Sequence, residues 1–270
     1  MTAAGSFPEW VSVFFFSFFS VVACLRPMQP RQRVNAIVFG IIGIGLVLLL
    51  FLPGLSEVNT FRRLLPLILI PMAYWQTGQF NAPLNQKLQA MLVRFDQHVL
   101  PMLERGIPRR IRRWLHVYGE YAYILCYPMV PSGIAVLYAA GAAGQIEEFW
   151  SVVLPPAYLC YATLPFLRTL PPRALEQRVE QQIPRRGIRK FNLFIVRLVT
   201  HQANTFPSGH AAAAVAVALG MGRVSNAIGI IYSVIAISII SGAFLGRYHY
   251  ALDLLLGAAL AVASYVLVSK

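Results

Sequence analysis

The sequence predicts an all-α, polytopic membrane bundle of about six to eight transmembrane helices, with amphipathic helices at the membrane interface. The composition supports this class, because 57% of the 270 residues are hydrophobic and only 12% are charged. A soluble domain carries about 25% charged residues. The apolar residues occur in long runs, and the basic residues behind the net charge of +13 lie between those runs. These patterns exclude a soluble enzyme and a disordered chain. They also predict that the basic residues meet membrane headgroups and not nucleic acid.

Eight apolar runs are candidate membrane spans, each of which needs about 20 mainly apolar residues. In chain order they cover residues 10–25, 35–52, 64–80, 117–140, 149–167, 207–221, 227–245 and 250–268. The third run contains Pro66 and Pro71 and ends in polar residues, so we expect it to be kinked or only partly inserted. The sequence shows neither an internal repeat nor a low-complexity linker, and the runs therefore predict one helical bundle.

Two long basic connections, residues 81–116 and 168–205, interrupt this bundle. Within the first, six apolar residues recur at helical spacing between residues 86 and 103: Leu88, Met91, Leu92, Phe95, Val99 and Met102. This spacing predicts an amphipathic helix that lies on the membrane. We expect the arginine-rich run at 109–113 to be a solvated segment that touches anionic headgroups, and specific lipid docking is the alternative.

The distribution of lysine and arginine predicts the orientation of the chain. With eight spans, the loops after the first, third, fifth and seventh spans share one side of the membrane, and most basic residues belong to them. The other side holds Arg62, Arg63, Arg223 and Lys270. The positive-inside rule places the first group in the cytoplasm. We therefore predict an integral, multi-pass protein of a bacterial inner membrane or a plasma membrane.

The most specific motif is Phe-Pro-Ser-Gly-His at residues 206–210, directly before an alanine-rich run. Proline and Ser208 suit a helix start, and Gly209 lets the backbone approach a ligand closely. A helix N-terminus offers free N–H groups and the positive end of the helix dipole, which together bind phosphate. His210 would lie in the first turn, beside that phosphate.

A second motif, Arg-Tyr-His-Tyr-Ala-Leu-Asp, covers residues 247–253. His249 and Asp253 are spaced i, i+4, so a helix places them on one face. The carboxylate can hold one imidazole nitrogen and leave the other free to attack. An ionisable residue that enters a membrane segment is costly and usually faces a polar cavity. The presence of His210 favours a functional pair over one that only ties helices together.

Arg168 and Arg173 form the third candidate motif, because they follow the fifth run on either side of a proline pair. Guanidinium groups bind phosphate oxygens through bidentate hydrogen bonds. The alternative is that both arginines are ordinary positive flanks of a membrane helix.

Three further residues are weaker candidates. Glu120 begins the fourth run and could contact an acceptor, although an ion pair with an arginine is the favoured interpretation. His201 and Asn204 lie just before the Pro-Ser-Gly-His motif, so they are candidate contacts in a loop beside the site.

The order of these motifs resembles the type 2 phosphatidic acid phosphatase (PAP2) superfamily. Arginine near a proline pair, then Pro-Ser-Gly-His, then His-x-x-x-Asp is similar to that family's signatures, over residues 161–257. Arg-Tyr-His-Tyr-x-x-Asp looks more like the branch that holds inositol phosphorylceramide synthases and sphingomyelin synthases. The resemblance implies N-terminal membrane helices plus a basic interfacial segment over residues 1–116. It implies a PAP2-like catalytic membrane core over residues 117–270.

The resemblance also implies a mechanism. His249 would attack phosphorus and form a phosphohistidine, Asp253 would orient it, and His210 would protonate the departing alcohol. Five residues would stabilise charge on the phosphoryl oxygens: Arg168, Arg173, Ser208, Gly209 and Arg247. No cofactor and no metal are expected. The three cysteines stand singly in apolar runs and predict neither metal ligands nor disulfides.

The predicted function is therefore hydrolysis of a lipid-linked phosphate by an integral membrane lipid phosphatase. The first alternative is a lipid phosphotransferase, which would use the same histidines to move a phospho-headgroup to a lipid alcohol. The second is a transporter or non-catalytic binder of anionic lipids, since half-helix ends and buried charges also occur in transporters. The sequence selects no single lipid from phosphatidic acid, phosphatidylglycerol phosphate, polyprenyl diphosphates and sphingolipids, and it predicts no oligomeric state.

Overall fold

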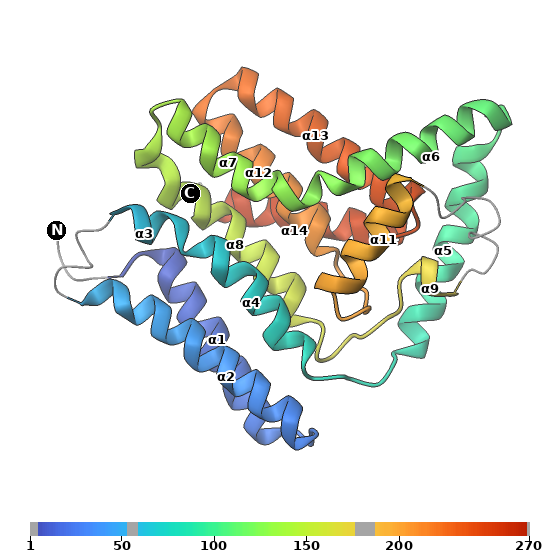
Figure 1. Ribbon diagram of the computed structural model, residues 1–270. Helices are drawn as coiled ribbons and strands as arrows, with labels where there is room; N and C mark the ends of the chain where they lie inside the picture. The colour runs from blue at the N-terminus through green and yellow to red at the C-terminus, as the bar shows by residue number, and fades with distance from the viewer. Residues whose placement is uncertain (1–4, 53–58, 176–186, 269–270) are drawn as a thin grey trace.

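The computed structural model describes residues 5–52, 59–175 and 187–268. These residues form thirteen α-helices and no β-strand, which confirms the predicted all-α membrane bundle (Figure 1). Four basic residues that entered the orientation argument lie outside the described part of the chain: Arg178, Arg185, Arg186 and Lys270.

The N-terminal third forms a helical hairpin with a third helix beside it. Its helices are α1 (Phe7–Leu25), α2 (Pro30–Leu48, continued by a 3-10 turn at Leu49–Phe51), α3 (Asn59–Leu64) and α4 (Pro66–Gly78). Ser6 and Glu9 form a capping box that starts α1. The buried amide of Gln76 donates to the carbonyl oxygens of Phe16 and Ala36, at 3.2 and 3.1 Å, and so ties α4 to the hairpin. Satisfying these carbonyls inside the bundle avoids the cost of an unpaired polar group.

Three helices follow that differ in part from the prediction. They are α5 (Gln86–Glu104), α6 (Arg109–Ile124) and α7 (Cys126–Ala139). Helix α5 begins at the predicted residue, where the Asn85 side chain accepts from the Leu88 N–H at 3.0 Å. Helix α6 begins earlier than predicted, because the arginine run at 109–113 forms its first turns. Helices α6 and α7 meet at a bend of 51°. Pro128 follows the bend and cannot donate to the carbonyl four residues earlier, which explains the break.

The C-terminal half packs around α12. Its long helices are α8 (Ile146–Ala162), α12 (Gly209–Val224), α13 (Asn226–Leu245) and α14 (Ala251–Val268). Helix α12 contacts α7, α8, α13 and α14. Its buried face is rich in alanine and glycine, which lets these neighbours approach closely. The short α9 (Pro172–Leu175) and α11 (Ile188–Val199) lie in a connection for which no helix was predicted.

All eight predicted apolar runs contain helices, but only some of these helices are long and apolar enough to cross a membrane. Helices α1, α2, α13 and α14 are long and apolar enough to cross a membrane, and the bent α6–α7 pair raises the total to five. Helix α12 is a shorter apolar helix. The third run forms α4, with only 13 residues, and its partial insertion stays a prediction.

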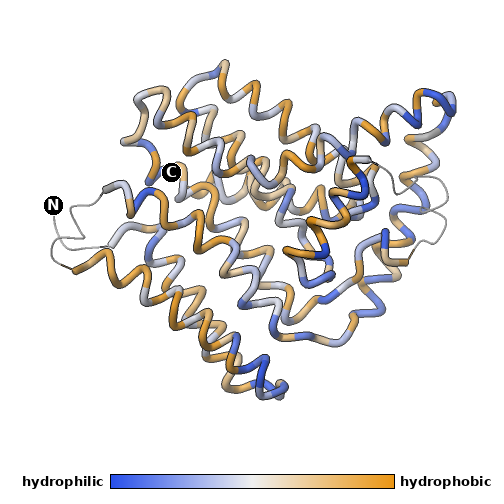
Figure 2. The backbone as a smooth tube through the Cα atoms, in the orientation of Figure 1, coloured by the Kyte–Doolittle hydropathy of each residue, from blue (hydrophilic) through white to orange (hydrophobic). Residues whose placement is uncertain are grey.

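The connections that follow α1, α4, α8 and α13 gather at one end of the bundle, here called the loop end (Figure 1). Backbone hydrogen bonds join three of these connections: Asn85 N–H donates to the Arg168 carbonyl at 2.9 Å, and Arg173 N–H to the Arg247 carbonyl at 3.0 Å. Hydrophilic residues gather at this end, whereas the helices are mainly hydrophobic along their length (Figure 2). Arg62, which pairs with Glu9 at 2.6 Å, lies at the opposite end. The cytoplasmic location of the loop end stays a prediction.

Candidate active site

His210, His249 and Asp253 lie together at the loop end. His210 stands in the first turn of α12, His249 lies two residues before the start of α14, and Asp253 is in the first turn of α14. Nδ1 of His210 lies 3.0 Å from Nε2 of His249. Nδ1 of His249 lies 3.3 Å from Oδ2 of Asp253. The three side chains therefore form a continuous chain of hydrogen bonds.

This chain of contacts assigns a tautomer to each histidine. The Asp253 carboxylate accepts, so Nδ1 of His249 carries the proton and donates it. Nε2 of His249 is then the acceptor, and the proton in the contact between the histidines belongs to Nδ1 of His210. The lone pair on Nε2 of His249 thus faces a nitrogen that carries a proton.

Asp253 is fully buried and is held by a second polar group. The amide of Asn204 donates to Oδ2 of Asp253 at 2.7 Å and to the Thr169 hydroxyl at 3.2 Å. Asn204 and Thr169 also form an isolated antiparallel bridge between the segment before α12 and the connection that follows α8. The sequence suggested Asn204 as a loop contact, but nothing in the spacing indicated Thr169 as its partner.

Ser208 and Gly209 join α12 to α14. The Ser208 N–H donates to the Asp253 carbonyl at 2.9 Å, and the Ser208 hydroxyl accepts from the Ala211 N–H at 3.4 Å as the helix cap. The Gly209 N–H donates to the Thr205 hydroxyl at 3.1 Å. Gly257 permits this junction, because a Cβ there would overlap the backbone of Ser208. Ser208 is completely buried, whereas Gly209 lines the pocket beside His210.

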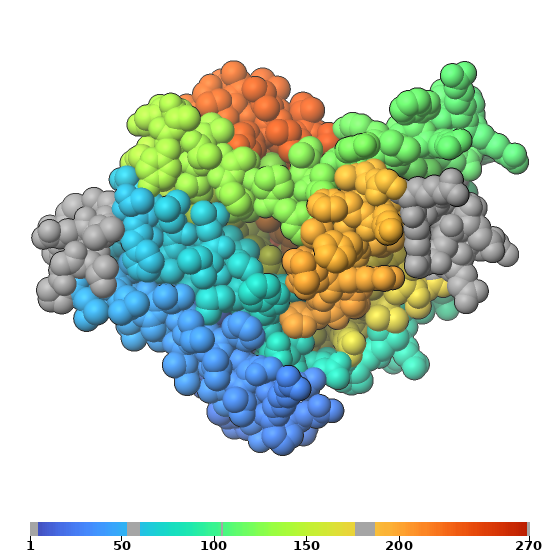
Figure 3. Space-filling view, viewed as in Figure 1, coloured from blue at the N-terminus to red at the C-terminus, as the bar shows by residue number. Residues whose placement is uncertain are grey.

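The two histidines open onto a cavity of about 440 Å³, here called the histidine pocket. Its wall is mainly apolar and aromatic and comes from α4, the α6–α7 pair, α8, α11 and α12. Residues that line it include Ile70, Tyr74, Tyr123, Tyr127, Val130, Tyr161, Val196 and Ala213. Figure 3 shows the molecule hollowed between α4, the α6–α7 pair and α11. This size and lining are typical of a site for a largely apolar ligand.

Arg173 is the predicted arginine that the structure brings to the histidine pocket. Its Nη1 donates to the Tyr248 carbonyl at 3.2 Å, and its guanidinium lies 5.4 Å from the centre of the Tyr248 ring. Burial lowers the pKa of Arg173, because a low-dielectric surrounding disfavours the charged form. Arg173 nevertheless stays protonated at neutral pH, since free guanidinium has a pKa above about 12. It therefore supplies a positive charge beside the histidines.

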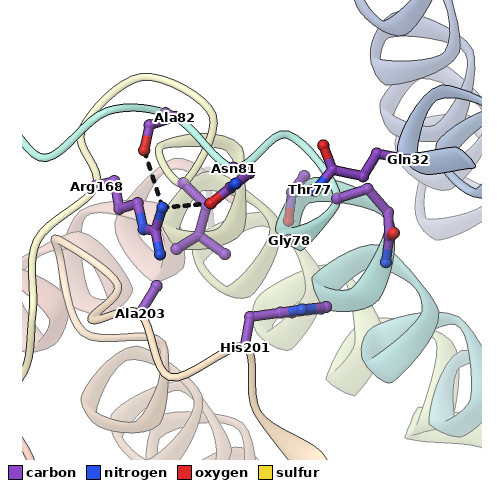
Figure 4. Close-up of a pocket in the computed structure, with 10 residues that line it drawn as sticks. Gln32, Thr77, Gly78, Asn81, Ala82, Arg168, His201 and Ala203 are labelled. Atoms are coloured by element: carbon purple, nitrogen blue, oxygen red, sulfur yellow. Dashed lines mark hydrogen bonds between the residues drawn. The ribbon is translucent and has the colours of Figure 1, made fainter. Parts of the chain in front are cut away.

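Arg168 and Arg247 lie elsewhere. Arg168 donates to the Asn81 side chain and to the Ala82 carbonyl, and it lines a separate pocket of about 240 Å³. Figure 4 shows this second cavity, here called the polar pocket, with Arg168 and His201 at its edges. Arg247 is buried and forms an ion pair with Asp96 at 2.7 Å. The structure thus separates three arginines that the sequence grouped as phosphate ligands.

A buried polar network supports the wall of the histidine pocket. Glu120 pairs with Arg189 of α11, accepts from the Asn192 amide at 2.8 Å, and accepts from the Tyr248 hydroxyl at 2.7 Å. Tyr248 in turn stacks on Tyr123, with ring centres 3.8 Å apart and planes at 3°. The ion pair agrees with the favoured interpretation of Glu120. Arg189 and Asn192 were missed, because the connection that carries them was not predicted to be helical.

Asp96 of α5 was also missed, although α5 itself was predicted. Its Oδ1 accepts from the Ala251 N–H at 2.9 Å, which caps the start of α14, and its Oδ2 binds Arg247. Burial raises the pKa of Asp96, although the Ala251 N–H and the Arg247 charge act in the opposite direction. The predicted interfacial helix is therefore attached directly to the segment that carries His249.

The comparisons with known proteins agree with this geometry. A family model described as PAP2 superfamily matches residues 91–267, from the middle of α5 almost to the end of α14. Neither the search of curated proteins nor the search of solved structures gave a match. Among the described residues, no three histidine, cysteine or acidic side chains are grouped so that they could hold a metal ion.

Proposed function

Because the chain belongs to the PAP2 superfamily, which indicates a phosphatase-type activity, we propose that it is a membrane enzyme acting on a lipid-linked phosphate through a phosphohistidine at His249. One observation carries this proposal. Nε2 of His249 faces Nδ1 of His210 at 3.0 Å, while the other nitrogen of His249 is held by Asp253. The proposed nucleophile His249 therefore lies between the carboxylate that orients it, Asp253, and the proposed acid–base group, His210.

The first step divides between the two histidines. A phosphoryl group enters between the two rings, which breaks the 3.0 Å hydrogen bond between them and moves them apart. Nε2 of His249 then forms a bond to phosphorus as the bond between phosphorus and the alcohol oxygen breaks. With the anionic phosphate bound, His210 is an imidazolium, protonated on both ring nitrogens, and it gives its Nδ1 proton to that oxygen and becomes neutral. Asp253 stabilises the positive charge that develops on the His249 ring, because its carboxylate lies on the opposite nitrogen.

The second step reverses these roles. Water attacks phosphorus, its proton passes to Nδ1 of His210, and the bond from phosphorus to Nε2 of His249 breaks. Arg173 supplies positive charge to the phosphoryl oxygens in both steps. Among the described residues that line the histidine pocket, it is the only lysine or arginine.

The histidine pocket supports a lipid as the substrate. Its lining is mainly apolar, and its hollow faces outward between α4, the α6–α7 pair and α11, where a bilayer would supply acyl or prenyl chains (Figure 3). A substrate can enter sideways from a bacterial inner membrane or a plasma membrane, with its chain between the helices and its phosphate at the loop end.

The resemblance to the inositol phosphorylceramide and sphingomyelin synthases adds a second candidate to this proposal. In an enzyme like the inositol phosphorylceramide or sphingomyelin synthases, an alcohol would replace water in the second step. The presence of a second, polar cavity beside the histidine pocket favours this phosphotransferase as the second candidate.

Phosphate release tests the proposal. The purified full chain in lipid nanodiscs is incubated with phosphatidic acid, phosphatidylglycerol phosphate and a polyprenyl diphosphate, with and without an added alcohol. We expect phosphate release that His249→Ala abolishes and that His98→Ala, at an exposed histidine of α5, preserves. Headgroup transfer only in the presence of alcohol would select the phosphotransferase. If the wild type and His249→Ala are both inactive in every assay, the phosphatase and the phosphotransferase proposals are both contradicted.

A further inference from the structure

The polar pocket differs in chemistry from the histidine pocket. Six of its lining residues carry polar side chains: Gln32, Thr77, Gln79, Asn81, Arg168 and His201. Its volume is about 240 Å³, which is smaller than the histidine pocket at about 440 Å³. It therefore suits a small, hydrophilic group and not a hydrocarbon chain.

Arg168 gives this pocket a positive charge that its described lining residues do not neutralise. Nη1 of Arg168 donates to two neutral oxygens, the side-chain oxygen of Asn81 and the carbonyl of Ala82 (Figure 4). No aspartate or glutamate is among the described residues that line the pocket. A guanidinium with neutral partners on one nitrogen keeps its other N–H groups for an anion, and it binds phosphate oxygens in a bidentate manner.

His201 adds a polar group without a partner. Its Nε2 is buried and makes no hydrogen bond in the described structure. The ring lies directly on Gly78, since a Cβ at that glycine would overlap it. Burial lowers the pKa of His201, so the ring is neutral at pH 7 and can donate to or accept from a hydroxyl group.

The two pockets share a wall. Ala203 lines both of them, while the neighbouring Asn204 holds Asp253. A group in the polar pocket therefore lies across one short segment of chain from the histidines, on the side away from the apolar cavity.

We infer that the polar pocket binds a polyol phosphate. Arg168 binds its phosphate, and the amides, Thr77 and His201 bind its hydroxyl groups. The inference goes beyond the proposed function, because it assigns a second ligand to a second pocket.

Binding in the absence of turnover tests this inference separately from catalysis. The full-length His249→Ala variant in nanodiscs is titrated with myo-inositol 1-phosphate by calorimetry. We expect binding that Arg168→Gln weakens at least about tenfold, which is about 1.4 kcal/mol. Arg94→Gln, at an exposed arginine of α5 outside both pockets, is the matched control and should have no effect.

A second variant keeps the inference testable if the Arg168→Gln protein does not fold. Gly78→Ala displaces the His201 ring and leaves Arg168 in place, and we expect it also to weaken binding. Absence of binding, equal binding by Arg168→Gln, or an equal loss with Arg94→Gln would overturn the inference. A loss confined to Arg173→Gln would overturn it as well, because the ligand would then occupy the histidine pocket. None of these results would affect the phosphate-release test of the proposed function.

Discussion

Nε2 of His249 lies 3.0 Å from Nδ1 of His210, although 39 residues separate the two histidines and they belong to the starts of different helices. The contact depends on the junction of α12 with α14, where Ser208 donates to the Asp253 carbonyl at 2.9 Å. The same junction therefore positions the proposed nucleophile, its carboxylate and the proposed acid. The predictions below test the parts of this arrangement one at a time.

The tautomer of His249 can be tested with Asp253→Asn. An asparagine of the same shape can donate to Nδ1 of His249, which would leave the proton on Nε2 and remove the attacking lone pair. We expect kcat for phosphate release to fall on the order of 10³- to 10⁴-fold, with little change in KM. Thr169→Val removes only the outer hydrogen bond to Asn204 and should cost at most about tenfold in rate. Equal rates for wild type and Asp253→Asn would refute the assigned tautomer.

The close approach of α14 to the start of α12 can be tested with Gly257→Ala. The added Cβ would overlap the Ser208 backbone, and such overpacking costs about 1–3 kcal/mol of stability. We expect a lower Tm together with a lower kcat, because the two histidines move apart. Gly45→Ala is the matched control, since no atom lies within 4 Å of the new Cβ there. A Gly257→Ala protein with unchanged Tm and kcat would show that the junction tolerates separation.

The Glu120 network can be tested by removing one charge and then both. Glu120→Gln leaves the buried Arg189 cation without a counter-ion, and breaking a buried pair in this way costs about 3–5 kcal/mol. The double variant Glu120→Gln/Arg189→Met removes both charges, so we expect it to recover much of the lost Tm. Thermal unfolding in nanodiscs measures both changes. A double variant that is less stable than Glu120→Gln would argue against an uncompensated charge as the cause.

His201 predicts a dependence of stability on pH. Burial lowers the pKa of its ring in the folded protein, so the unfolded chain binds a proton more readily. The contribution to stability is fully present above the unfolded pKa of about 6.5 and is lost as the pH falls towards the lowered folded value. We expect the Tm of the wild type to fall more steeply below pH 6.5 than that of His201→Gln. Parallel Tm curves would show that His201 titrates alike in both states.

Much of the helical architecture could be predicted, because it depends on patterns along the chain. The period of apolar residues gave the start of α5 at Gln86, and the i, i+4 spacing of His249 and Asp253 indicated their contact, although His249 lies outside α14. Both are local relationships between residues close in the chain. Residues 161–257, where the resemblance was recognised, lie inside the longer family match at 91–267.

The partners of the charged residues could not be predicted. Asp96 and Arg247 are 151 residues apart, and Glu120 and Arg189 are 69 residues apart. No periodicity connects such positions, because only the packing of α5 and α11 on the bundle brings them together. For the same reason Arg168, Arg173 and Arg247 formed one group in the sequence, whereas the structure gives each a different environment.

The division of the chain at residue 116 stays a prediction. The family match begins within α5, before that boundary, and α5 is attached to α14 through Asp96. These contacts show why composition alone is a weak guide to the boundary. The basic interfacial segment and the core share buried polar contacts, which a count of charged residues does not reveal.

The most direct test of the central proposal is to trap the intermediate. A lipid phosphate labelled with ³²P is mixed with the purified protein, and the reaction is stopped rapidly at alkaline pH, where phosphohistidine survives. We predict label on the peptide that contains His249 in the wild type and no label in His249→Ala. Label on His210, or turnover of substrate by a wild type that carries no label at any time, would contradict the proposed role of His249.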